Sequence, residues 1–111
     1  MEEQIDINEN HGEYIGYVKW FNKKKGYGFI TITDGGHQGE DVFCHFSDIA
    51  TENYKIIYPG EFISCDVETK KDDGKLICKN VTGVHGYPLL GDNSKYMYKI
   101  IPKNRQPRVQ E

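Results

Sequence analysis

The chain has 111 residues with 14 basic and 17 acidic side chains, a formal net charge of −3, and 13% aromatic residues. This length suits one small domain with loose ends and excludes a two-domain enzyme. No stretch approaches the roughly 20 apolar residues of a membrane span, and the acidic start MEEQIDINENHGE does not resemble a secretory signal. We therefore expect a cytoplasmic protein that does not contact a membrane, with the nucleus as the alternative location.

Short runs of β-branched and aromatic residues alternate with clusters of Gly, Asp and Asn, and no segment keeps a helical period. The sequence predicts five strands, at residues 14–22, 27–33, 41–46, 61–69 and 75–84. A short helical turn is expected at the start of the long connection 47–60. This pattern favours an all-β fold, a five-stranded antiparallel OB-fold barrel with flexible N- and C-terminal extensions. In the C-terminal extension three prolines disfavour a helix or central strand, although Leu89, Leu90, Ile100 and Ile101 could pack on the domain.

Charge divides the chain into three regions. Residues 1–13 form an acidic arm with a net charge of −5, residues 14–84 form the organised domain, and residues 85–111 form a C-terminal extension. The end of that extension, residues 95–111, is a basic tail with a net charge of +4. Inside the domain four lysines, Lys19, Lys23, Lys24 and Lys25, are opposed only by Asp34 between positions 14 and 34. A local basic patch can therefore exist on a chain of negative net charge.

Alternation along the second and third predicted strands assigns their side chains to two faces. The residues expected to face the core are Ile30, Ile32, Val42 and Cys44. The opposite, exposed face would then carry Tyr27, Phe29, Phe43 and His45. The alternative is that the rings themselves form the core. In the first predicted strand, alternation either exposes Trp20 or buries Lys19 unless the strand bends or bulges, and the sequence leaves that choice open.

Exposed aromatic side chains are costly, at ~1.5 to 3 kcal/mol for each one left unburied, so a cluster of them calls for a function. Rings interleaved with lysines on one face of a sheet suit a single-stranded nucleic acid, because bases stack on rings while phosphates pair with ammonium groups.

Other kinds of site find less support in the sequence. Cys44, Cys65 and Cys78 are odd in number and lack the spacing of a disulfide framework or a zinc site, so we expect reduced thiols. The four histidines are scattered, and no pair of carboxylates is brought together by spacing. We therefore expect no catalytic residues, no metal, no cofactor and no small-molecule substrate.

Four segments resemble motifs of the cold shock domain in their order and spacing, and together they span about residues 14–84: GYVKWFN, KGYGFI, DVFCHFS and NVTG. The resemblance implies an OB-type barrel whose second and third strands bind single-stranded RNA and DNA. It also implies an exposed Trp20 and therefore a bent first strand. The positions that match the family's binding residues are Lys19, Trp20, Phe21, Lys25, Tyr27, Phe29, Phe43, His45, Phe46 and Tyr54, the last in the long loop.

Residues 83–96 resemble the extension that follows the domain in eukaryotic Y-box proteins, so a eukaryotic or eukaryotic-virus source is expected rather than a bacterial one. The function that we expect is binding of single-stranded RNA and DNA with low sequence specificity, as an RNA chaperone or a regulator of translation or transcription. We expect a monomer. The alternative is an OB-fold module that binds a protein partner through its aromatic face.

Overall fold

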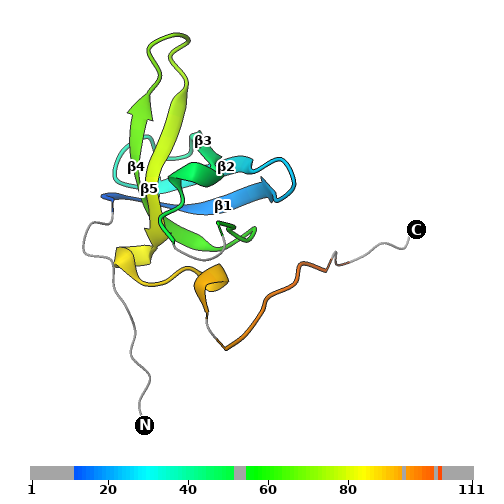
Figure 1. Cartoon of the computed structure of the whole chain (residues 1–111). Helices are drawn as coiled ribbons and strands as arrows, with labels where there is room; N and C mark the ends of the chain where they lie inside the picture. The colour runs from blue at the N-terminus through cyan, green and yellow to red at the C-terminus, as the bar shows by residue number, and fades with distance from the viewer. Residues whose placement is uncertain (1–11, 52–54, 94, 102, 104–111) are drawn as a thin grey trace, which may run out of the picture.

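Five strands form a closed barrel in the computed structural model, which describes residues 12–51, 55–93, 95–101 and 103 (Figure 1). The strands are β1 (Tyr14–Asn22), β2 (Tyr27–Asp34), β3 (Asp41–His45), β4 (Phe62–Thr69) and β5 (Leu76–Gly83). Each boundary lies within one residue of the prediction. Three 3-10 helices complete the described structure: η1 (Phe46–Asp48), η2 (Val84–Gly86) and η3 (Leu90–Asp92).

The strands follow the order β1-β2-β3-β5-β4 around the barrel, and β1 pairs with both β2 and β4. Four pairings are antiparallel, while β3 and β5 run parallel where Phe43 lies opposite Ile77. A closed ring with an odd number of strands cannot alternate direction throughout, so one parallel pairing must occur. The predicted all-β OB-fold barrel is thus confirmed, with this one parallel contact as a detail that the sequence did not reveal.

The core contains the residues that alternation placed there. Ile30, Ile32, Val42 and Cys44 are buried, so the alternative in which the rings fill the barrel is wrong. The remaining buried apolar residues are Val18, Ile49, Ile57, Ile63, Cys65, Cys78, Val81 and Leu89. The three cysteines are free thiols. Hydrogen bonds with Cys44 and Cys65, together with burial, raise the pKa of the Cys78 thiol, so this group stays protonated and unreactive.

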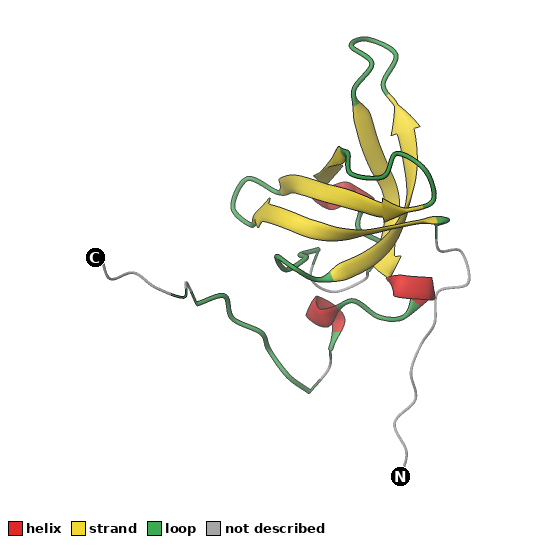
Figure 2. Cartoon of the chain, turned by 180° about the vertical axis from the view of Figure 1, so that it is seen from behind, coloured by secondary structure: helices red, strands yellow, loops and turns green. Residues whose placement is uncertain are grey.

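The C-terminal extension begins with η2 and η3, which lie beside the barrel (Figure 2). Leu89 is 4% exposed and belongs to the core, as the sequence allowed, whereas Ile100 and Ile101 are exposed. The carboxylate of Glu61 accepts hydrogen bonds from the backbone N–H of Tyr58 (3.0 Å) and of Leu90 (2.7 Å). One side chain therefore joins the extension to the segment that precedes β4.

Burial raises the pKa of the Glu61 carboxyl, against the smaller opposing effect of its two backbone hydrogen bonds. Within the described residues, no helix has the length and apolar composition needed to cross a membrane.

Candidate nucleic-acid interface

Strands β1, β2 and β3 bring four aromatic rings into one cluster on the outer face of the barrel. Trp20 lies 5.5 Å from Phe29 and 5.7 Å from Tyr27, measured between ring centroids. Phe43 completes the cluster, stacked on Tyr27 at 5.6 Å and meeting Phe29 edge-on at 5.7 Å. We call Trp20, Tyr27, Phe29 and Phe43 the ring cluster. Each ring covers part of its neighbours, which lowers the cost of keeping four apolar side chains at the surface.

A β-bulge in β1 explains how Trp20 reaches this face. Val18 pairs with Ile30 and Trp20 pairs with Phe29, so Lys19 is the extra residue that has no partner of its own on β2. Alternation is reset at the bulge, leaving Val18 1% exposed in the core and Trp20 39% exposed outside. The bent first strand that the family resemblance implied is present, and Lys19 stays exposed.

A second aromatic pair lies where β3 ends. The rings of His45 and Phe46 are 4.5 Å apart at an angle of 33°, and Phe46 is 43% exposed. Phe46 was expected to end the strand but begins η1, because the Ser47 backbone N–H donates to Nδ1 of His45 (3.2 Å), which turns the chain. Tyr27 lies opposite His45 on β2, so this pair continues the ring cluster along the same face.

Gly26 makes room for Phe46. It has a φ of 76°, and a Cβ atom at this position would lie 2.5 Å from Cδ2 of the Phe46 ring. The Gly26 carbonyl also accepts a hydrogen bond from the Phe46 backbone N–H at 2.8 Å. A side chain at Gly26 would therefore meet both backbone strain and a steric clash.

Lys19 is paired with a carboxylate of β3. Its Nζ lies 2.7 Å from Oδ2 of Asp41, while the Thr31 hydroxyl donates to Oδ1 of the same carboxylate at 2.7 Å. The hydrogen bond and charge of Asp41 raise the pKa of Lys19, and the hydrogen bonds from Lys19 and Thr31 lower the pKa of Asp41. Asp41 was not among the site residues that the sequence predicted.

The other expected positions are placed as follows. Lys25 is exposed in the turn between β1 and β2, where its backbone N–H donates to Oδ1 of Asn22 at 2.9 Å. Phe21 is half-buried and packs against the core. Tyr54 lies outside the described residues. Among the described residues, no group of three or more His, Cys, Asp or Glu side chains is arranged to hold a metal ion.

A closed OB-type barrel with aromatic rings and lysines on one outer face defines a class of single-strand-binding proteins. The family model of the 'Cold-shock' DNA-binding domain matches residues 14–84, and the chain belongs to this family. Proteins of this family bind single-stranded nucleic acids.

Similar proteins come from plants and bacteria. Glycine-rich protein 2 of Nicotiana sylvestris is 42% identical over 76 residues, which cover 68% of this chain and 34% of that protein. Cold shock domain-containing protein 4 of Arabidopsis thaliana is 37% identical over 89 residues, or 79% of this chain and 42% of that protein. The cold shock-like protein CspB of Escherichia coli K12 is 44% identical over 54 residues, or 49% of this chain and 72% of that protein. The chain thus spans less than half the length of the two plant proteins.

Proposed function

We propose that this protein binds single-stranded RNA and DNA with low sequence specificity through the face formed by β1, β2 and β3. The single observation that supports this proposal is the ring cluster, in which each ring lies within 6 Å of its neighbours on a sheet flanked by exposed lysines. Stacking needs only the flat face of a base and therefore tolerates any sequence.

Each proposed contact has a distinct role. The bases stack on the ring cluster and on the pair formed by His45 and Phe46, and the phosphates meet Lys19 and Lys25. Phe21 is half-buried and packs against the core, and its part in binding is proposed from the family resemblance alone. The residues proposed to bind are Lys19, Trp20, Phe21, Lys25, Tyr27, Phe29, Phe43, His45 and Phe46, and Tyr54 remains a prediction from the sequence.

The cellular role that follows is non-catalytic. At ~1 to 3 kcal/mol per stacked base, three or four rings give micromolar or tighter binding. A protein that holds bases apart and then releases them acts as an RNA chaperone, and one that occupies a message or promoter regulates translation or transcription. We propose that it does so as a monomer in the cytoplasm, with 14–84 as the binding domain and 1–13 and 85–111 as its arms.

Fluorescence of the single tryptophan tests this proposal directly, because Trp20 lies in the ring cluster. Titration with oligo(dT) or oligo(U) should quench its emission as a base stacks beside it, whereas a duplex DNA of the same length should not. Tight binding without quenching would place the nucleic acid on another face. No binding at all would favour the alternative of a protein-binding module, although lysines around the rings speak against such an interface.

A further inference from the structure

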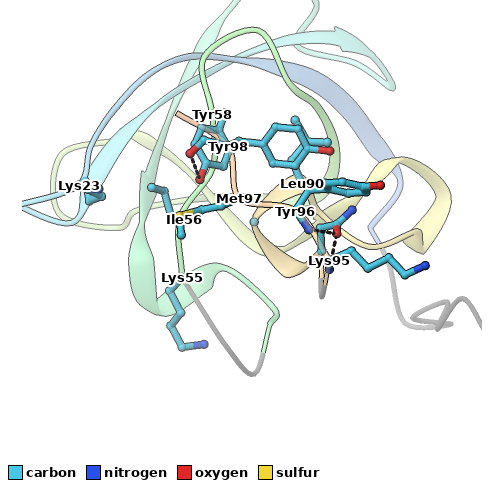
Figure 3. A pocket seen from close by; sticks show the side chains of 11 residues that line it. Lys23, Lys55, Ile56, Tyr58, Leu90, Lys95, Tyr96, Met97 and Tyr98 are labelled. Carbon is cyan, nitrogen blue, oxygen red and sulfur yellow. Dashed lines mark hydrogen bonds between the residues drawn. The ribbon is translucent and has the colours of Figure 1, made fainter. Parts of the chain in front are cut away.

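A second concave surface lies between the segment that precedes β4 and the C-terminal extension (Figure 3). Its volume is about 550 Å³. Tyr58 lines it from the first segment, and Tyr96 and Tyr98 line it from the extension. Lys23 and Lys55 also line this groove, the former from the turn between β1 and β2.

Specific contacts hold the extension in position. The Tyr58 hydroxyl donates to the Tyr98 carbonyl at 3.3 Å, and the two rings meet edge-on at 6.0 Å. Gly91 allows the close approach of the two segments, because a Cβ there would lie 3.0 Å from Cγ2 of Ile56. Oδ1 of Asn93 accepts hydrogen bonds from the backbone N–H groups of Lys95 and Tyr96, each at 2.7 Å. The groove therefore has walls fixed by packing and hydrogen bonds.

The groove combines the same two kinds of side chain as the ring cluster and its lysines. Tyr96 is 67% exposed, so its ring lines the groove without being covered by the protein. Lys55 donates to the carbonyls of Ile49 (3.1 Å) and Thr51 (3.0 Å), which leaves its ammonium charge intact and one donor for a ligand. None of the described residues that line the groove is acidic. Exposed rings beside lysines, in a lining whose described residues include no carboxylate, fit a nucleic acid better than a protein partner.

The groove also adjoins one end of the proposed binding face. Lys23 belongs to the turn that ends at Gly26, where the Gly26 N–H donates to the Asn22 carbonyl at 2.7 Å. The same Gly26 contacts Phe46, the last ring of that face. The turn that carries Lys23 therefore belongs both to the groove and to the Phe46 end of the binding face.

We propose that this groove is a second binding site for the same single-stranded nucleic acid. Only nucleic acids too long for the ring cluster alone would bind there. The inference rests on the proposed function, since it requires that a single-stranded nucleic acid binds to the face of β1, β2 and β3. A nucleic acid bound at the barrel face holds its free end near the groove, so the second contact is intramolecular. The affinity should therefore be higher for a nucleic acid long enough to reach both sites than for one that fills the barrel face alone.

The test compares an oligo(dT) of about 6 nucleotides, which fits the barrel face, with one of about 14 nucleotides. The full chain and its double variant Lys23→Ala/Tyr96→Ala are titrated with both strands by fluorescence anisotropy. The matched control is Lys71→Ala/Tyr87→Ala, which removes an exposed lysine and an exposed tyrosine outside the groove. The groove variant should lose about tenfold affinity for the long strand and less than about twofold for the short one. The control should change neither.

Several results would overturn the inference. Unchanged affinity of the groove variant for the long strand would remove the second binding site, and equal losses for both lengths would mean that these residues act at the barrel face instead. A change of oligomeric state in the groove variant, with nucleic-acid binding intact, would assign the groove to a second copy of the chain. Failure of the wild-type chain to bind even the short strand would instead refute the proposed function, which keeps the two failures distinguishable.

Discussion

Nζ of Lys19 lies 2.7 Å from Oδ2 of Asp41, so the lysine at the β-bulge already has an anionic partner before any nucleic acid arrives. A phosphate that approaches Lys19 must share its ammonium group with this carboxylate or displace it. The pair is exposed, which makes its effect on stability small but its effect on an approaching phosphate direct.

Asp41→Asn should strengthen binding to an oligonucleotide, because it removes a negative charge from the interface and releases Lys19. Because few lysines contact phosphates, the logarithm of the wild-type association constant should fall with the logarithm of the salt concentration at a slope of roughly −2 to −3. The slope of the variant should be steeper by about 0.7. Affinity measured across a salt series gives both values. Asp72→Asn, in the turn between β4 and β5, makes the same change in net charge away from the site. An equal gain in both variants would show that only the overall charge matters.

Phe29→Ala and Phe43→Ala should each weaken oligo(dT) binding by at least about tenfold, because each removes a stacking surface from the ring cluster. Both side chains are half-buried and touch each other, so a loss of about 1 kcal/mol in unfolding free energy is expected from the lost ring contact. Phe62→Ala is the control, since Phe62 is an aromatic residue on the surface, 53% exposed, whose ring packs on Tyr17. A similar loss of binding in that control would contradict the assigned face.

Gly26→Ala should weaken nucleic-acid binding, whereas Gly74→Ala should not. The two glycines have nearly the same φ, 76° and 73°, so alanine costs each about 1 kcal/mol in backbone strain. Only at Gly26 would the new methyl group push against Phe46, since nothing lies within 4 Å of a Cβ at Gly74. Equal stability and equal binding of the two variants, measured by denaturant unfolding and anisotropy, would show that the position of Phe46 does not matter.

Stability should depend on pH through Glu61. Because burial raises its pKa in the folded state above the ordinary 4.5, the folded protein holds this proton more tightly than the unfolded chain. The contribution of Glu61 to stability is therefore largest below its ordinary pKa and is lost as the pH rises through the folded-state pKa. The unfolding free energy of the wild type minus that of Glu61→Gln should thus increase as the pH falls from about 7 towards 4.5.

The opposite slope in that comparison would show that the N–H groups of Tyr58 and Leu90 favour the ionised carboxylate by more than burial opposes it. Other titrating groups cancel in the difference between the two proteins, because they are common to both.

Alternation and turn residues were sufficient to predict the strands and the core face of β2 and β3, since both depend on neighbours along the chain. The exposure of Trp20 could not be derived in this way, because it depends on a bulge at Lys19 that the sequence permits but does not require. The family resemblance supplied that answer, and the bulge is its physical cause.

Contacts between distant segments were beyond the reach of local patterns. The pairing of Lys19 with Asp41 joins residues on different strands. The attachment of Leu90 depends on the carboxylate of Glu61, which the sequence pattern indicated only as the first residue of a strand. The groove beside Tyr58 arises from the same attachment. The apolar residues Leu89 and Leu90 indicated that the extension packs on the domain, but not which residues they contact.

The closure of the barrel between β1 and β4 has a consequence for synthesis of the chain. Tyr14 of β1 pairs with Cys65 of β4, so one edge of β1 lacks its hydrogen-bonding partner until β4 has been synthesised. Until then β1, β2 and β3 present both their ring cluster and their uncovered apolar inner face, with Ile30 and Val42 exposed to water. Such a nascent sheet is prone to wrong association, and a nucleic acid already bound to its rings would shield one of the two faces while β4 and β5 are being made.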